Sequence, residues 1–87
     1  MKIDEPGRYS TRNGRIVIVD EVKLVDVADW SEGKPVNRKE VRAVGRLLAM
    51  SGDENLSERN FWRANDGSFG PNQGVGHNYD LVSMLAV

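Results

Sequence analysis

The sequence predicts an all-β domain in which several short antiparallel strands form a small barrel or sandwich. Three observations point to this class. The turn signals Asn13-Gly14 and Asp66-Gly67 punctuate the chain. The segments between the turns are rich in Val, Ile and aromatic residues, which favour strands. The glycine-rich stretch over residues 70–78 is compatible with a surface loop and with neither a helix nor a central strand.

The whole chain has 87 residues and a formal net charge of −1, and it contains no cysteine. This length predicts one domain with a thin core over residues 1–87. Without cysteine there is no disulfide or thiolate metal site, and the low charge argues against nucleic-acid binding through bulk charge. The sequence shows neither a long apolar span nor a secretion signal, so we expect a cytoplasmic protein without a membrane partner.

The first element is a hairpin. Asn13-Gly14 predicts a two-residue type I′ loop, because that turn requires positive φ at both central positions. Residues 9–12 and 15–19 flank the loop with β-favouring side chains. Pro6-Gly7 predicts the turn that begins the first strand.

The next strand is long and interrupted. Over residues 16–30 the apolar alternation changes phase at Asp20-Glu21, which predicts a bulge or a bend there. We expect residues 30–35 to form a loop. Five acids lie within residues 20–32 and five bases within residues 34–46, and we expect these blocks to offset each other across neighbouring strands.

Residues 37–50 are compatible with two structures. Asn37 and Glu40 resemble a helix capping box, and four apolar side chains follow on one helical stripe. Gly45 in the middle disfavours a helix, and the alternate residues also fit a strand that is buried on both faces. The β-rich surroundings favour the strand, with a short helix as the alternative.

The last third of the chain predicts two more strands. Residues 56–63 form the first of them, and the turn over residues 65–68 follows. Residues 70–78 form the glycine-rich loop. Residues 79–87 close the chain as the last strand.

Three short motifs carry a family resemblance. The stretch PGRYSTRNGR, residues 6–15, resembles the opening PGxYxTRxGR of small SH3-like β-barrel proteins that bacteriophages encode. Residues 62–69 resemble the tryptophan, Asp-Gly and aromatic of that family, and residues 79–82 resemble its closing YDLV. The resemblance implies an SH3-like barrel in the cytoplasm of an infected bacterial host. It implies no reaction, since most members are accessory proteins.

Two segments depart from that pattern. Residues 30–58 are longer and more charged than the family pattern, and residues 70–78 are an insertion. Additions of this kind often carry the activity of a small scaffold, because loops vary while the barrel holds its form.

The sequence shows no catalytic set. His77 is the single histidine, and only Asp80 lies near it in sequence as a second metal ligand. The glycine-rich loop lacks the Gly-Lys-Ser/Thr ending of a phosphate-binding loop. We therefore expect no enzyme, no metal and no cofactor.

The candidate recognition patch is a strand in which two aromatic residues lie between two arginines. Because neighbouring residues on a strand point to opposite faces, one of Phe61 and Trp62 should face the core and the other should be exposed. Exposed aromatic and arginine side chains are typical of binding hot spots. We expect the patch to bind a partner together with the loop histidine, through Arg59, Phe61, Trp62, Arg63 and His77.

These observations favour a non-enzymatic phage accessory protein that binds and modulates a host protein or a defence complex. The first alternative is a nucleic-acid-binding barrel, in which Arg8, Arg12 and Arg15 would act together with the arginines of the patch. The second is a nucleotide-sequestering protein, in which residues 70–78 would close over the ligand.

Overall fold

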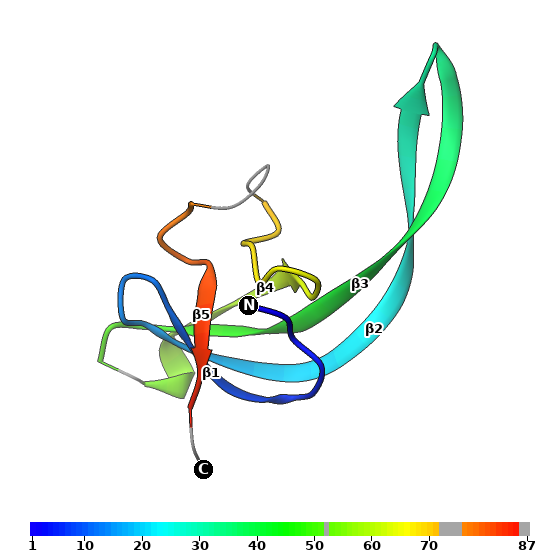
Figure 1. The fold of residues 1–87 in the computed structure, drawn as a ribbon. Helices are drawn as coiled ribbons and strands as arrows, with labels where there is room; N and C mark the ends of the chain where they lie inside the picture. The colour runs from blue at the N-terminus through cyan, green and yellow to red at the C-terminus, as the bar shows by residue number, and fades with distance from the viewer. Residues whose placement is uncertain (52, 72–75, 86–87) are drawn as a thin grey trace.

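The computed structural model describes residues 1–51, 53–71 and 76–85 of this chain. It is all-β, and its five strands form one antiparallel sheet in the order β4-β3-β2-β1-β5 (Figure 1). The strands are β1 (Gly7–Thr11), β2 (Ile16–Ser31), β3 (Lys34–Leu48), β4 (Ser57–Arg63) and β5 (Leu81–Met84), and a 3-10 turn, η1 (Glu54–Leu56), precedes β4.

The sheet curls like a barrel without closing. Strands β4 and β5 are its two edges, and the segment after β4 spans part of the gap between them. The N–H of Leu81 donates to the carbonyl of Gly67 at 2.8 Å, and the N–H of Ile3 donates to the carbonyl of Ala64 at 2.7 Å. The predicted all-β, barrel-like fold is confirmed.

The core lies inside this curl. Trp62 is its largest buried side chain, and the indole N–H donates to the carbonyl of Tyr79 at 2.8 Å. The Tyr9 ring is buried beside it, and its hydroxyl donates to the carbonyl of Glu5 at 2.6 Å. These two bonds satisfy the polar atoms that both rings carry into the core. The core cluster comprises Ile3, Tyr9, Val17, Val19, Ala43, Leu47, Trp62, Ala64 and Leu81.

The first hairpin is present, but its loop differs from the prediction. Within residues 11–15 only Gly14 has positive φ, at 85°, and its N–H donates to the carbonyl of Thr11 at 3.0 Å. This is a three-residue loop rather than the predicted type I′ pair. The reason is local, because the Thr11 hydroxyl accepts from the N–H of Arg15 at 2.9 Å and so holds the longer turn.

The long second strand bends where the sequence predicts. The register of β2 with β3 shifts between Val19 and Glu21, which confirms the bulge. Residues 37–48 are strand, so the helix alternative is wrong. Gly45 allows β3 to lie close against β2 at the bulge, because a Cβ at this position would come within 2.8 Å of the Cα of Val19.

The loop predicted over residues 30–35 is wrong. Strands β2 and β3 continue to Ser31 and Lys34 and are joined by Glu32 and Gly33 alone. Both residues have positive φ, 54° and 75°, as a type I′ hairpin loop requires. The type I′ loop therefore occurs here rather than at Asn13-Gly14.

The far half of the β2–β3 hairpin forms an arm, residues 23–41, that rises away from the body of the molecule (Figure 1). Strand β1 pairs with β2 only as far as Val19, and β4 pairs with β3 only from Arg42 onward. The molecule therefore measures 45 × 23 × 21 Å along its principal axes. Asp26 binds Lys39 at 2.9 Å and Asp29 binds Arg38 at 3.3 Å, which confirms that the acidic and basic blocks offset each other.

The remaining elements follow the prediction. Strand β4 matches the predicted strand over residues 56–63 except at its first residue. The predicted turn follows it, and Gly67 in this turn has a φ of 77°. Strand β5 is shorter than predicted, with four residues. The predicted loop over residues 70–78 falls partly outside the described residues. No helix within the described part of the chain is long and apolar enough to cross a membrane.

Candidate partner-binding site

The two neighbouring aromatic residues of β4 point to opposite faces of the sheet, as predicted. Trp62 pairs with Ala43 on the core face and is 0% exposed. Phe61 pairs with Val44 on the outer face and is half-buried. The prediction that Trp62 contacts a partner is therefore wrong, because its ring fills the centre of the core. Phe61 is the aromatic residue of the patch that a partner can reach.

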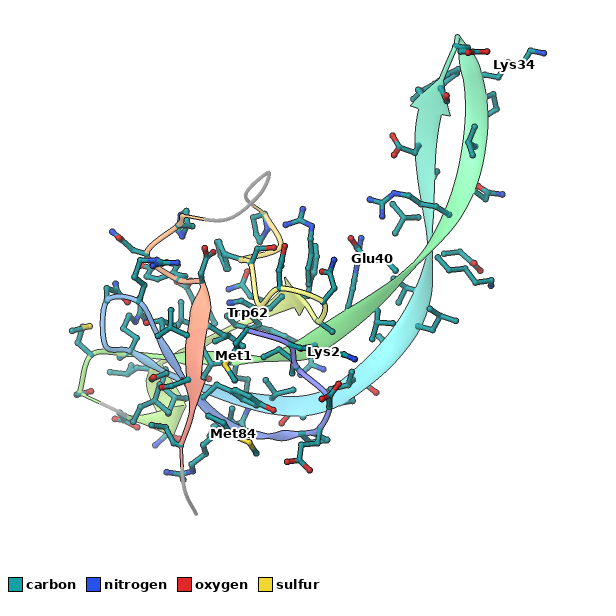
Figure 2. All side chains as sticks on the ribbon, in the orientation of Figure 1. Met1, Lys2, Lys34, Glu40, Trp62 and Met84 are labelled. Atoms are coloured by element: carbon teal, nitrogen blue, oxygen red, sulfur yellow. The ribbon has the colours of Figure 1, made fainter. Side chains whose placement is uncertain are left out.

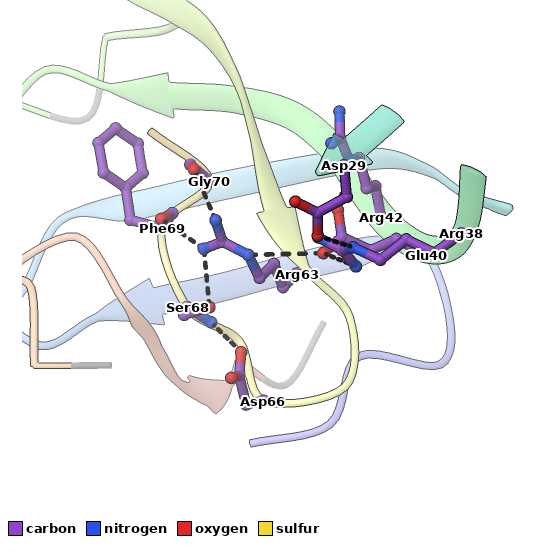
Figure 3. Close-up of polar contacts among 9 residues, drawn as sticks. All are labelled: Asp29, Arg38, Glu40, Arg42, Arg63, Asp66, Ser68, Phe69 and Gly70. Atoms are coloured by element: carbon purple, nitrogen blue, oxygen red, sulfur yellow. Dashed lines mark hydrogen bonds and ion pairs between the residues drawn. The ribbon is translucent and has the colours of Figure 1, made fainter. Parts of the chain in front are cut away.

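Arg63 forms an internal clamp. Its guanidinium donates to the Ser68 hydroxyl at 3.3 Å and to the carbonyls of Phe69 and Gly70 at 3.2 and 3.1 Å (Figure 3). It also lies 3.5 Å from the carboxylate of Glu40 on β3. Arg63 thus holds the segment after β4 against the sheet, and most of its donors are used within the molecule.

Glu40 joins the arm to the body. Its carboxylate accepts from Arg42 at 2.8 Å and lies 3.5 Å from Arg38 and from Arg63 (Figure 3). Partial burial alone would raise the pKa of this carboxyl group. The hydrogen bond from Arg42 and the charges of the three arginines outweigh burial, so the pKa of Glu40 lies below its ordinary value.

A hollow of about 420 Å³ opens on the outer face beside Phe61. We call it the Phe61 hollow. Side chains of β2, β3 and β4 contribute to it, and Pro71 lies at its rim. Gly70 lies against the Phe61 ring without leaving room for a Cβ, so it fixes where the ring lies. The lining residues are Lys23, Val25, Arg42, Val44, Arg59, Asn60, Phe61 and Pro71.

The Phe61 hollow combines an apolar floor with a charged rim. The Arg42 guanidinium lies over the Phe61 ring at 4.1 Å from its centroid. Each cation of the rim has a carboxylate neighbour: Lys23 has Glu21 at 3.3 Å, Arg42 has Glu40 at 2.8 Å, and Arg59 has Asp20 at 3.3 Å. The rim therefore offers directed donors without a large excess of positive charge.

His77 belongs to a different part of the molecule. Its ring stacks on Phe69 with a centroid distance of 4.9 Å, and Phe69 in turn contacts Trp62 on the core side of β4. Its Nδ1 accepts from the N–H of Tyr79 at 3.0 Å. His77 therefore packs on Phe69 and does not join Phe61 in one patch. Its position in the predicted glycine-rich loop did not indicate this packing.

The three arginines near the first turn do not join the patch either. Arg12 lies 3.7 Å from the buried carboxylate of Asp80. Arg15 donates to the carbonyl of Leu48 and to the hydroxyl of Tyr79, both at 2.9 Å. Arg8 is exposed on β1, which β2 and β3 separate from β4. Arg8 shares the outer face with Arg46 and Arg59, because the three lie in one register row across the sheet, whereas Arg12 and Arg15 are engaged elsewhere.

The sequence reading missed two features. Half of the Phe61 hollow comes from alternate residues of β2 and β3, which become neighbours only once the tip of the hairpin is placed at Glu32-Gly33. The second is Trp30 at the end of the arm, which is 74% exposed. Residues 30–35 read as a loop, so no face could be assigned to Trp30.

Among the described residues, no group of three or more His, Cys, Asp or Glu side chains could hold a metal ion. Comparisons of the chain with protein-family models, with curated proteins and with solved structures found no match.

Proposed function

We propose that this protein is a non-enzymatic binding protein that engages a host protein through the Phe61 hollow. The observation that carries the proposal is the hollow itself, in which arginine donors from two strands surround a half-buried aromatic ring. Arginine and aromatic side chains in such a setting are the groups that dominate protein interfaces. The phage setting, and a host defence complex as the target, are supported by the resemblance of residues 6–15, 62–69 and 79–82 to phage-encoded small barrels.

The chemistry of the hollow favours a partner segment that carries a carboxylate beside an apolar side chain. Arg42 and Arg59 present planar donor groups that match a carboxylate in two-point geometry. Val25, Val44 and Phe61 provide an apolar floor for the neighbouring side chain. An acidic segment would exchange the solvent-exposed pairing of Arg59 with Asp20 for a pairing with the partner.

A protein fits this surface better than a nucleic acid does. Nucleic-acid binding needs cations that are free to neutralise several phosphates. Here the three cations of the rim each have a carboxylate within 3.3 Å, and Arg12 and Arg15 bind groups within the chain.

The test compares one tagged wild-type chain with three variants in bacterial lysate, followed by binding measurements on the captured protein. We expect Phe61→Ala and Arg59→Glu to weaken binding at least about tenfold, as hot-spot substitutions do. Val82→Ser on β5, 43% exposed in the native chain, is the matched control and should bind like the wild type.

Equal capture by all four chains, or by none, contradicts the proposal. A gel-shift series with single-stranded DNA at low salt accompanies the test, and we expect no shift. A shift that Arg59→Glu abolishes would assign the hollow to nucleic acid instead.

A further inference from the structure

The arm leaves one edge of β2 unpaired. Beyond the bulge, over residues 23–31, β2 has β3 on one side and, within the part of the chain that the structure describes, no neighbouring strand on the other. Backbone N–H and C=O groups along such an edge are ready to pair with a further strand. A two-stranded ribbon is also marginally stable by itself, so a third strand would stabilise the arm.

The two edges of the arm differ in how they are protected. The edge of β3 carries Pro35, which cannot donate a hydrogen bond, and the cations Lys34, Arg38 and Lys39. Lysine and proline on an edge are typical means of preventing strand addition. The edge of β2 reads KLVDVADWS over residues 23–31, with valines at alternate positions and no proline. The open edge is therefore that of β2.

We propose that this edge pairs antiparallel with the same edge of a second copy, with the two-fold axis at Val27. Val27 is the midpoint of the unpaired residues 23–31, so this register uses the whole free edge of both chains. In one copy the arm projects away from the body (Figure 2), so antiparallel pairing of two arms would place the two bodies at opposite ends of the assembly. The product is a four-stranded sheet in the order β3-β2-β2-β3, and the contact is self-complementary, as a two-fold interface requires.

The side chains support this register. Leu24, 59% exposed, falls opposite Trp30 of the second copy, 74% exposed, so the two most exposed apolar groups of β2 cover each other. On the other face, Lys23 falls diagonally beside Asp29 of the second copy, so each Asp29 would lie between this lysine and its own Arg38. No two like charges stand directly opposite each other, and each Asp26 keeps its own Lys39 at 2.9 Å.

Cysteine cross-linking tests the register, because the native chain contains no cysteine. Directly opposed residues of paired strands are close enough for a disulfide, and Val27 is the position that faces itself. We expect Val27→Cys to oxidise to a covalent dimer at least about tenfold faster than Val25→Cys on the same strand and face, since residues 25 are displaced from each other in this register. Val36→Cys on the protected edge is the second control.

Charge exchange at the same position tests the interface without oxidation. Val27→Lys and Val27→Asp each place like charges across the axis, so sedimentation should show monomers where the wild type forms dimers. An equimolar mixture should recover the dimer, because Lys then faces Asp. Val36→Lys and Val36→Asp, each alone, should sediment like the wild type.

Three results would overturn the proposal. The first is a wild-type chain that sediments as a monomer up to about millimolar concentration. The second is a Val25→Cys or Val36→Cys chain that cross-links as fast as Val27→Cys. The third is a mixture of Val27→Lys and Val27→Asp that stays monomeric. Circular dichroism of each variant checks that the strands remain folded. Lys23 and Val25 also line the Phe61 hollow, but all of these measurements use the purified chain without the Phe61 partner, so a monomeric result leaves the proposed function standing.

Discussion

At the residue scale, Gly45 decides the path of the central strands. It lies opposite Val19, where β2 bulges, and the two backbones approach so closely that a side chain does not fit. The sequence showed Gly45 only as a residue unfavourable to a helix. Its positive role depends on the neighbouring strand, so it could be recognised only once the register was known.

We predict that Gly45→Ala destabilises the fold by more than about 3 kcal/mol, because the new Cβ would meet backbone atoms of Ile18 and Val19 that cannot move independently. Urea unfolding followed by tryptophan fluorescence measures the loss. Gly76→Ala is the comparison without a clash: it has open space but a φ of 103°, so it should cost only the backbone strain, about 1–2 kcal/mol. Equal stability of Gly45→Ala and the wild type would contradict the close approach.

The role of Arg63 could not be predicted from the sequence. The sequence placed it beside Phe61 as a contact residue, whereas its hydrogen bonds reach three residues of the following segment. Arginines of a binding surface and arginines of an internal clamp look alike in a sequence. Neighbouring positions indicated only that one of Phe61 and Trp62 faces the core and the other faces outward. Which ring takes which side was not readable from the sequence.

Arg63→Ala should lower the free energy of unfolding by about 2–3 kcal/mol, since it leaves the carbonyls of Phe69 and Gly70 without their donor. Arg63→Lys keeps the charge beside Glu40 but cannot reproduce the planar set of donors, so it should recover less than half of the loss. Arg59→Lys, at an exposed pair with Asp20, should change stability by less than about 0.5 kcal/mol. Chemical unfolding of the three variants measures the order, and equal losses at positions 59 and 63 would refute the clamp.

At the element scale, the strands were predictable and the loops less so. Alternating apolar residues predicted β2 and were compatible with β3, which the β-rich surroundings favoured over a short helix. The phase change at Asp20-Glu21 predicted a bulge or a bend, and the bulge is present. Both hairpin loops differ from their predictions. The hydroxyl of Thr11 holds a three-residue loop in place of the type I′ pair, and Glu32 adopts positive φ, which allows a two-residue loop where residues 30–35 were predicted to form a longer one. The length of the arm could therefore not be predicted from the sequence, and neither could the register of β2 and β3 that forms the Phe61 hollow.

The arm should be dispensable for folding, because the core cluster contains no residue between Val19 and Ala43. We predict that replacing residues 27–38 by Asn-Gly, which joins the paired residues Asp26 and Lys39, leaves the midpoint of thermal unfolding within about 5 °C of the wild-type value. Glu40, Arg42 and Arg63 are retained in this design, whereas Arg38 is removed with the arm. Circular dichroism measures the midpoint, and loss of the folded baseline would show that the arm supports the core.

At the scale of the whole molecule, an all-β domain follows from the sequence because every level agrees on it: turn residues, β-favouring segments and a length that allows one thin core. The closure of the sheet does not follow, since it depends on contacts between distant segments. The N-terminal residues, the turn after β4 and the start of β5 meet through the backbone bonds of Ile3 and Leu81. Such contacts have no signal in neighbouring residues.

Acid and alkali should unfold the protein through different groups. Burial alone would raise the pKa of Glu40, but its arginines outweigh burial and lower it. Burial alone would also raise the pKa of Asp66, but hydrogen bonds from Ser68 and the charges of Arg63 and the N-terminus lower it. Burial and the nearby charges of Glu5 and Asp4 raise the pKa of Tyr9. Carboxyl groups with a lowered pKa stabilise the fold above their unfolded-state value and lose this contribution as pH falls through the folded-state value. A hydroxyl with a raised pKa contributes fully below its unfolded-state value and loses the contribution as pH rises through the folded-state value.

We therefore predict that the free energy of unfolding is level between about pH 5 and 9 and falls on both sides. Glu40→Gln should lower the free energy of unfolding in this level range, because the arginines lose a charged partner. The difference from the wild type should disappear as pH falls through the lowered pKa of Glu40, because both side chains are then neutral. Tyr9→Phe should remove most of the decline above about pH 10. Urea unfolding across this pH range measures both differences. A deficit of Glu40→Gln that is equally large at every pH would mean that packing, and not the charge of this carboxylate, links the arm to the body.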